Sequence, residues 1–131
     1  MNNKYIKIKS DLYKCEFNYE KEENVNSVEI AFDDKLILNK IEENKIRAKL
    51  QRNLSFKPLV QTYVKVYYEL TIETASEINK DTFFADIRKG IPLLANVFSR
   101  TSLVISQLTN ASVFGPVITP PGYDNHKIEL E

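Results

Sequence analysis

The stretch 63-YVKVYYELTIE-73 decides the fold class. Its apolar side chains occupy every second position from Val64 to Ile72, with Lys65 and Glu69 among the residues between them. A period of two is typical of a strand with one buried and one exposed face. Tyr63 and Tyr67 fall on the outer face, where large amphipathic rings favour a protein interface, although exposed tyrosines on a sheet are also ordinary. We predict a strand here.

The same alternation extends toward the N-terminus and predicts three further strands, over about residues 6–19, 28–38 and 46–56. In the first of them the apolar phase moves from even to odd positions, which indicates a bulge or bend at Ser10-Asp11. Polar turns are expected at residues 21–24 and 42–45, and Asp33-Asp34 is interpreted as a solvated turn doublet. Pro58 is expected to end the strand before it.

After residue 80 the pattern becomes helical. Asp81 or Thr82 suits the cap of a short helix that Gly90 would stop, and an apolar stripe with helical spacing predicts a long helix over 93–110. Three prolines between 114 and 124 exclude regular helix there and predict an extended segment with a frayed tail.

These elements predict one α+β domain over residues 1–131: a four-stranded antiparallel sheet with a short helix and one long C-terminal helix packed on one face. The strand half covers about residues 4–78, the helical half about 81–111, and the extended Pro-rich tail 114–131.

The outer face of the long helix is small and uncharged. It carries Ser99, Ser102, Leu103 and Ser106, and the helix contains neither Lys nor Glu. Small residues let another helix approach closely, so this face is a candidate helix-to-helix subunit contact. The alternative is a plain solvated Ser/Thr face.

Composition excludes several function classes. Eighteen Lys and Arg balance eighteen Asp and Glu among 131 residues, so the chain lacks the overall field of a dedicated nucleic-acid or anionic-membrane binder. One cysteine, Cys15, and one histidine, His126, supply neither a disulfide nor a Cys/His zinc site. No apolar run approaches the ~18 residues of a membrane span, and we expect a soluble cytoplasmic protein without membrane insertion.

Catalytic motifs are not found. The three glycines lie far apart in the chain, the carboxylate doublets fall in predicted turns, and the helix serines have no base to activate them. We therefore expect no enzymatic activity and no cofactor.

The order of segments in the second half resembles the SecB family of protein-export chaperones. The resemblance lies in Asp81-Thr82-Phe83-Phe84, in Gly90-Ile91-Pro92-Leu93-Leu94, in the helix over 95–110, and in the run from Phe114 through Gly115-Pro116 and Pro120-Pro121 to Asp124. It implies a SecB-like sheet-and-helix fold, a dimer or a tetramer built as a dimer of dimers, and ATP-independent binding of non-native polypeptide. The chain stops before the second C-terminal helix that SecB proteins usually have, so it resembles a divergent member.

The resemblance also implies partners. Export chaperones dock on the SecA motor through an acidic sheet surface, for which Glu29, Asp33, Glu69 and Glu73 are candidates by position. SecB-like proteins also serve as dedicated chaperones of an antitoxin, so a holdase and a protein dedicated to one partner both remain open, with a small-ligand binder as a residual alternative. Aromatic and apolar groups suit client binding, and each of these could instead be core: Tyr5, Tyr13, Phe84, Phe98, Phe114, Val117, Ile118 and Tyr123.

Overall fold

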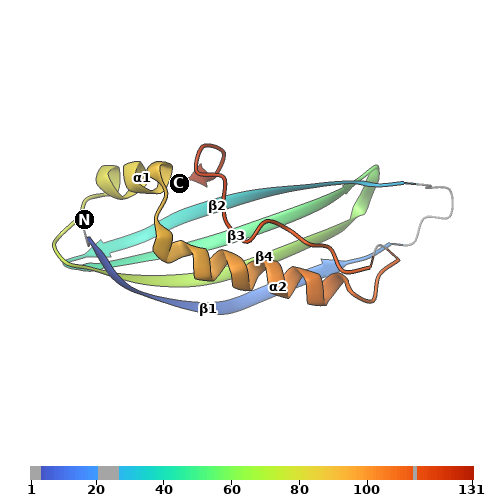
Figure 1. Ribbon diagram of the computed structural model, residues 1–131, viewed down its shortest axis with the longest axis horizontal. Coiled ribbons are helices and arrows are strands. Elements are labelled where there is room, and N and C mark those ends of the chain that lie inside the picture. The colour runs from blue at the N-terminus through green and yellow to red at the C-terminus, as the bar shows by residue number, and fades with distance from the viewer. Residues whose placement is uncertain (1–3, 21–26, 114) are drawn as a thin grey trace.

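The protein is one long curved sheet with its helices on one side (Figure 1). The computed structural model describes residues 4–20, 27–113 and 115–131. Four long strands pair antiparallel, and a fifth, short strand pairs parallel with β2, in the order β1-β4-β3-β2-β5. The strands are β1 (Tyr5–Asn18), β2 (Glu29–Glu42), β3 (Lys45–Lys57), β4 (Leu59–Thr74) and β5 (Glu129–Leu130).

The sequence predicted four strands, and the fifth corrects that prediction. Residues 125–131 are not a frayed tail, because β5 adds to the outer edge of β2 opposite Lys35 and Leu36. The Leu38 amide donates to the Glu131 carbonyl at 2.7 Å, and the Glu131 amide donates to the Leu36 carbonyl at 2.9 Å. Two residues are too few to show an alternating pattern, so the sequence carried no strand signal here.

The predicted phase change in β1 is real but lies further along the strand. The register with β4 shifts between Leu12 and Lys14, which leaves Tyr13 as the extra residue of a bulge, and it shifts again between Tyr5 and Lys7. Because of the bulge at Tyr13, Leu12 and Cys15 both face the helix side of the sheet, as their partners on β4 do.

The Asp33-Asp34 turn prediction is wrong. Strand β2 runs unbroken through both residues, and its register shift lies later, between Leu38 and Lys40. Asp34 is buried because its even position places it on the covered face beside Leu36. The predicted turn at 21–24 lies in part of the chain outside the described residues, whereas the turn after Glu42 and the strand end before Pro58 are confirmed.

Two α-helices and a 3-10 turn follow the sheet. Helix α1 (Lys80–Lys89) is capped by Asn79, whose side chain accepts from the Thr82 amide at 2.8 Å, and not by the predicted Asp81 or Thr82. Gly90 ends α1 with a φ of 98°, a conformation that glycine adopts without strain. The 3-10 turn η1 (Pro92–Leu94) leads into α2 (Ala95–Thr109). The helix predicted over 93–110 is therefore present but shorter, because its first two residues belong to the 3-10 turn.

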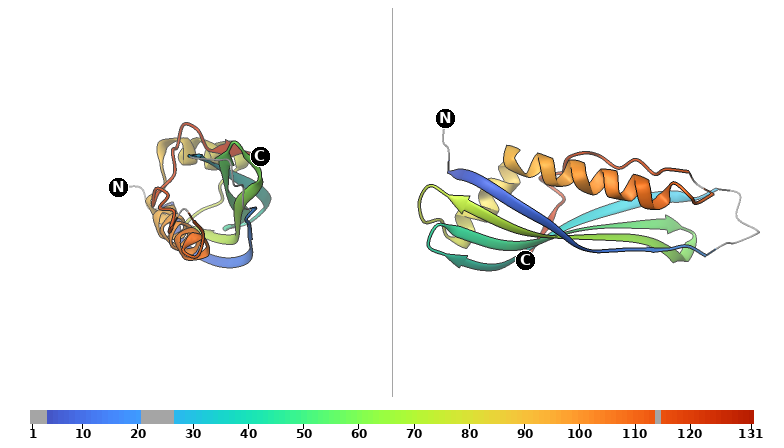
Figure 2. Two further views of the ribbon diagram at one scale, coloured as in Figure 1. Left: turned by 90° about the vertical axis from the view of Figure 1, so that its right-hand side faces the viewer. Right: turned by 90° about the horizontal axis from the view of Figure 1, so that it is seen from below.

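Both helices and the C-terminal segment lie on the concave side of the sheet (Figure 2). Even-numbered residues of β3 and β4 point to this side and form the core with Phe83, Ile87, Leu94, Val97, Phe98 and Ile105. The opposite side of the sheet is covered by none of the elements in the described part of the chain, and we call it the open face.

No helix within the described residues is both long and apolar enough to cross a membrane.

Candidate polypeptide-binding site

A buried arginine organises the middle of the concave side. Arg52 points inward from β3 and has no exposed surface. Its Nε donates to Asp34 Oδ1 at 2.6 Å and its Nη2 to Asp34 Oδ2 at 2.9 Å, a bidentate ion pair. Because the Asp34 carboxylate is buried too, each charge compensates the other where water cannot.

The remaining donors of Arg52 hold the C-terminal strap, which we define as residues 117–123. Nη1 donates to Thr119 Oγ1 at 3.0 Å and to the Pro120 carbonyl at 2.7 Å, while Nη2 donates to the Gly122 carbonyl at 2.9 Å. A guanidinium has five N–H donors, and each of the five has an acceptor here. The strap is therefore fixed to the sheet by one side chain.

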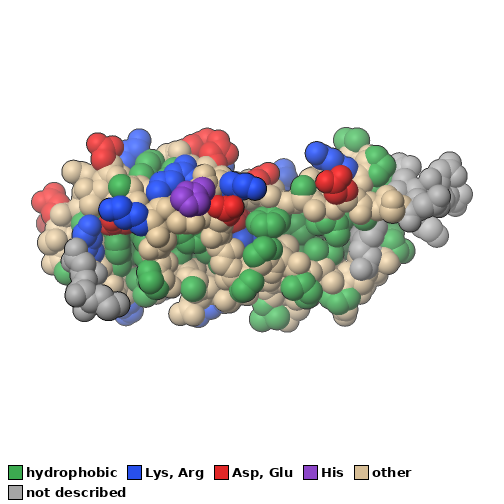
Figure 3. Space-filling model, turned by 45° about the horizontal axis from the view of Figure 1, so that its top comes forward, with side chains coloured by type: hydrophobic (Ala, Val, Ile, Leu, Met, Phe, Trp, Pro, Cys, Tyr) green, Lys and Arg blue, Asp and Glu red, His purple; other side chains and the backbone are tan. Residues whose placement is uncertain are grey.

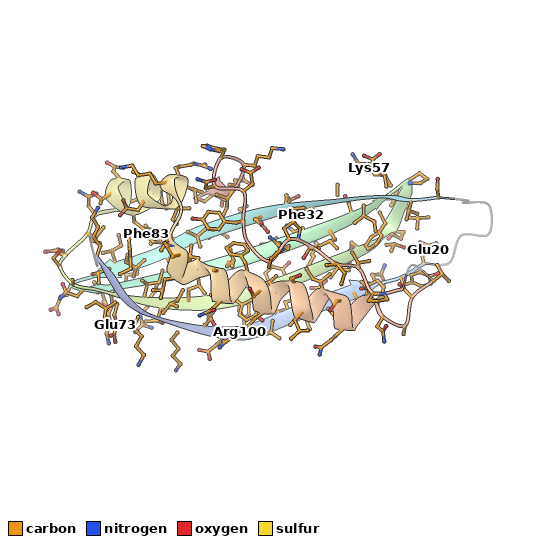
Figure 4. All side chains as sticks on the ribbon, viewed as in Figure 1. Glu20, Phe32, Lys57, Glu73, Phe83 and Arg100 are labelled. Atoms are coloured by element: carbon orange, nitrogen blue, oxygen red, sulfur yellow. The ribbon has the colours of Figure 1, made fainter. Side chains whose placement is uncertain are left out.

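Aromatic rings enclose the same guanidinium. The Arg52 Cζ lies 4.9 Å from the centre of the Phe32 ring and 5.2 Å from that of Phe98. Phe98 is fully buried and stacks on Tyr123 of the strap at 5.0 Å, whereas Phe32 on β2 is 40% exposed. Phe32 thus packs against the buried Arg52 guanidinium and still keeps part of its ring exposed (Figure 4).

Helix α2 holds the other side of the strap. The Ser102 hydroxyl donates to the Thr119 carbonyl at 2.7 Å, and the Val117 amide donates to the Thr109 hydroxyl at 2.8 Å. Val117 and Thr119 are buried by these contacts, and Ile118 between them is 76% exposed. The strap therefore turns one large apolar side chain outward, at the residue before Thr119, whose hydroxyl accepts from Arg52.

Apolar side chains remain exposed around the strap, toward the end of the sheet where β2 begins. We call Ile30, Phe32 and Ile118 the distal patch. Ile30 and Phe32 point to the concave side, as their register partners Phe56 and Leu54 do, but each keeps about two-fifths of its surface exposed. Figure 3 shows hydrophobic side chains gathered over this half of the molecule. The patch offers apolar area that the fold does not use.

The backbone edge beside this patch is unpaired within the described part of the chain. Leu36 and Leu38 bond outward to Glu131, so the even residues before them in β2, from Ile30 on, also direct their N–H and C=O groups to the outer edge. Strand β5 covers only the part of the edge beside Lys35 and Leu36. The outward groups of Ile30 and Phe32 have no partner among the residues that the structure describes.

The client-binding candidates from the sequence are spread over three places. Tyr5 and Phe84 lie near α1, where the Tyr5 hydroxyl donates to Asp86 Oδ2 at 2.6 Å and both rings pack against Phe83. Tyr5 also lines a surface pocket of about 220 Å³. Burial, followed by the hydrogen bond to Asp86, raises the pKa of the Tyr5 phenol.

The strap candidates divide between core and surface. Val117 is buried, and Tyr123 is half-buried, accepting from the Ile91 amide at 3.0 Å and donating to the Ile87 carbonyl at 2.9 Å. Burial raises the pKa of Tyr123. Ile118 is the strap candidate that stays exposed. Phe114 lies outside the described residues.

The predicted subunit face of α2 is partly occupied within the chain. Ser99 and Ser102 donate to strap carbonyls, and Ser106 donates to the Leu103 carbonyl of its own helix. Leu103 is 58% exposed and has no such role. The other interface candidates, Tyr63 and Tyr67, lie on the open face, as does Tyr13 through its ring contact with Tyr67 at 5.8 Å.

The four acidic candidates for SecA docking also lie on the open face, but among cations. In the register Glu29 pairs with Lys57, Glu69 with Lys49, and Glu73 with Lys45. Asp33 accepts from Asn53 Nδ2 at 3.1 Å. This face is mixed in charge and not acidic.

The residues that organise the site, Arg52 and Asp34, were not predicted from the sequence. Arg52 occupies an even position in β3, in phase with Leu50 and Leu54, and Asp34 is in phase with Leu36. Two opposite charges at core-facing positions of neighbouring strands indicate a buried ion pair. This pair could therefore have been predicted from the alternation. The exposure of Ile30 and Phe32 could not be predicted, because the sequence pattern does not show which residues of β2 the strap covers.

Sheet, helices and C-terminal segment together define a mixed α+β protein with a SecB-like fold. Its structure is similar to that of Rv1957 from Mycobacterium tuberculosis, a SecB-like chaperone solved in complex with a ChAD peptide from the Rv1956 HigA1 antitoxin. The match has a TM-score of 0.64 at 6% identity, over 92% of this chain and 88% of that chain. A protein of unknown function from Streptococcus agalactiae matches with a TM-score of 0.39 at 8% identity, over 87% of this chain and 96% of that one. No family model matches, and no curated protein matches in sequence.

Proposed function

We propose that this protein is an ATP-independent chaperone that binds an extended, apolar segment of another polypeptide at the distal patch. The segment adds as a strand to the free first half of the β2 edge and lays alternate side chains on Ile30, Phe32 and Ile118. The observation that carries the proposal is the coincidence of unpaired backbone groups with exposed apolar side chains on the same stretch of β2.

The unpaired backbone groups and the exposed apolar side chains contribute to binding in different ways. Backbone hydrogen bonds to an added strand are independent of sequence, whereas burial of alternate side chains selects apolar segments. An unprotected strand edge beside apolar side chains is also a hazard for aggregation, and proteins usually cover such edges. A binding function explains why this edge is left free.

A chaperone dedicated to one partner is the second form of the same function. The free stretch of edge is short, which suits one segment of a particular protein, and the structural neighbour Rv1957 was solved with an antitoxin peptide. A general holdase would bind many clients through the same patch. Because the open face is not acidic, the proposal does not include SecA.

The binding test uses reduced, carboxymethylated α-lactalbumin, which is permanently unfolded, as the probe. We expect wild-type protein to bind it, and Ile118→Ser to bind it about tenfold more weakly because one exposed apolar side chain no longer becomes buried. Val60→Ser is the matched control: Val60 is 86% exposed but belongs to β4, outside the patch. Fluorescence anisotropy of the labelled probe gives both affinities.

Two results distinguish the forms. Binding to this probe supports a general holdase. A failure to bind it, together with tight binding of one peptide from a scan of the proteins encoded beside this chain, supports a dedicated chaperone. If no peptide and no unfolded protein binds, or if Ile118→Ser and Val60→Ser weaken binding equally, the distal patch is not the site.

Self-association is the second part of the proposal. Leu103 exposes a large apolar side chain on the outer surface of α2, and we propose that it packs against a second copy. Leu103→Glu should lower the solution mass measured by light scattering, because a buried glutamate at a subunit contact is unfavourable. Gln107→Glu, a neighbouring exposed position on the same helix, is the control. A wild-type monomer would contradict this part.

A further inference from the structure

The open face concentrates tyrosines and lysines at the junction of β1, β4 and β3. The Tyr13 and Tyr67 ring centres lie 5.8 Å apart, and Tyr63 lies further along β4 on the same face. Each ring has a lysine ammonium over it: Lys14 lies 5.5 Å from the centre of Tyr67, Lys49 5.5 Å from Tyr13, and Lys65 5.0 Å from Tyr63. None of these residues takes part in the proposed chaperone site.

Strand β3 adds a polar and cationic row beside the rings. Gln51, Asn53 and Ser55 are the register partners of Tyr67, Lys65 and Tyr63. The cations Lys45, Arg47, Lys49 and Lys57 face the same side, and β3 contains no carboxylate at all. The chain has zero formal charge overall, but every charged residue of β3 on this face is basic.

Carboxylates on the neighbouring strands offset part of this charge, since Glu29 and Glu73 are the register partners of Lys57 and Lys45. Glu16 forms an ion pair with Lys14 at 2.8 Å, and that contact lowers the pKa of Glu16. Asp11 and Glu69 face each other across β1 and β4, and Glu69 also neighbours Lys49. We therefore expect electrostatic attraction to come mainly from β3, and affinity to depend on the rings as much as on charge.

One class of ligand uses both features. An acidic peptide would use the lysines and leave the rings unused, and an apolar peptide would do the reverse. Single-stranded nucleic acid has aromatic faces that stack on tyrosine and an anionic backbone that lysine and arginine bind. Amide and hydroxyl side chains beside the rings can bond to base edges. An antiparallel sheet with helices on only one side is a known platform for such stacking.

We propose that the open face binds a short stretch of single-stranded nucleic acid, with bases stacked on Tyr67 and Tyr13 and the phosphate backbone along the basic row of β3. This site is separate from the distal patch, which lies on the concave side of the sheet, and it stands or fails independently of the proposed chaperone function.

The test is fluorescence anisotropy with fluorescein-labelled oligo(dT) and oligo(U) of twelve nucleotides at low and moderate salt. We expect saturable binding at about 50 mM NaCl that weakens roughly tenfold at 200 mM. Tyr67→Ala should weaken binding at least about fivefold because one stacked base is lost, and Tyr67→Phe, which keeps the ring, should restore it. Lys49→Gln should weaken binding, whereas Lys89→Gln on α1 should not.

Each other outcome overturns the proposal. Without saturable binding of either oligonucleotide at 50 mM NaCl there is no such site. Binding that Tyr67→Ala leaves unchanged, and that polyglutamate displaces, assigns the face to an acidic protein. A dimer that Tyr67→Ala dissociates assigns it to a second copy of the chain. Ile118→Ser should leave oligonucleotide binding unaltered, which separates this result from the chaperone test.

Discussion

The two halves of β2 face the same concave side of the sheet but end up in different surroundings. Beside Lys35 and Leu36 the edge is paired with β5, and Leu36 is fully buried. Beside Ile30 and Phe32 the edge has no partner among the described residues, and both side chains are partly exposed. The alternation of apolar residues is the same in both halves, so the difference comes from the C-terminal segment and not from the strand.

At the α1 end of the sheet, the pairing of β5 with β2 depends on polar contacts between segments far apart in the chain. Arg88 of α1 donates to the Asn125 carbonyl at 3.2 Å and to the Ile128 carbonyl at 2.6 Å, which positions β5 beside β2. At the other end the strap is held by Arg52 and α2, and Ile30 keeps 41% of its surface exposed. The distal patch thus arises because the C-terminal segment covers one half of β2 less completely than the other.

The largest effect should come from removing the charge that holds the strap. Arg52→Met leaves the Asp34 carboxylate buried without its partner, and we expect the free energy of unfolding to fall by about 3–5 kcal/mol. Urea denaturation measures this loss. In Arg52→Met combined with Asp34→Leu no unpaired charge remains, so the double variant should be more stable than Arg52→Met alone. A double variant as unstable as the sum of both single variants would contradict a coupled pair.

The next effect concerns the free edge itself. Ile30→Pro removes an outward N–H at an edge position, where proline is tolerated, and should block strand addition. We expect affinity for the unfolded α-lactalbumin probe to fall at least tenfold, with little change in the thermal midpoint. Ile30→Val keeps the N–H and is the control. Equal affinities of the two variants would mean that the polypeptide binds through side chains alone.

The smallest effect should appear at the closed end. The raised pKa of Tyr5, caused by burial and then by Asp86, means that folding favours the protonated phenol. Its contribution is fully present below the unfolded pKa of about 10 and is lost as the pH rises above that value. Tyr5→Phe should lower the free energy of unfolding by about 1 kcal/mol at pH 7 and flatten its decline above pH 10.

The control for this measurement is Tyr67→Phe on the open face, compared by urea denaturation between pH 7 and 11. An unfolding free energy of Tyr5→Phe that declines above pH 10 as steeply as that of the wild type would show that the Tyr5 hydroxyl does not contribute.

Much of the fold was predictable because it depends on local patterns. Each correct prediction rests on the residues of a single element that packs on the core. Examples are the period-two alternation from Val64 to Ile72, the helix end at Gly90 and the helical apolar stripe after Pro92. The fifth strand was not predictable, since two residues have no period and their pairing depends on Arg88, some forty positions earlier.

The site was less predictable for a related reason. Ile118 was identified as a candidate because it is a large apolar residue in a segment that three prolines exclude from regular helix, but Ile30 and Phe32 have the same pattern as core residues. Their exposure is decided by where the strap runs, which is a long-range property. Arg52 and Asp34 could have been predicted as a pair, because the alternation places both charges at core-facing positions.

The five acceptors around Arg52 also fix a distance. Because the guanidinium bonds to Thr119, Pro120 and Gly122 at once, the strap cannot slide by one residue without losing acceptors for several donors. Ile118 is therefore held at a set separation from Phe32. The width of the apolar surface between these two residues is thus set by a side chain that is itself fully buried, and it depends on the spacing from Thr119 to Gly122.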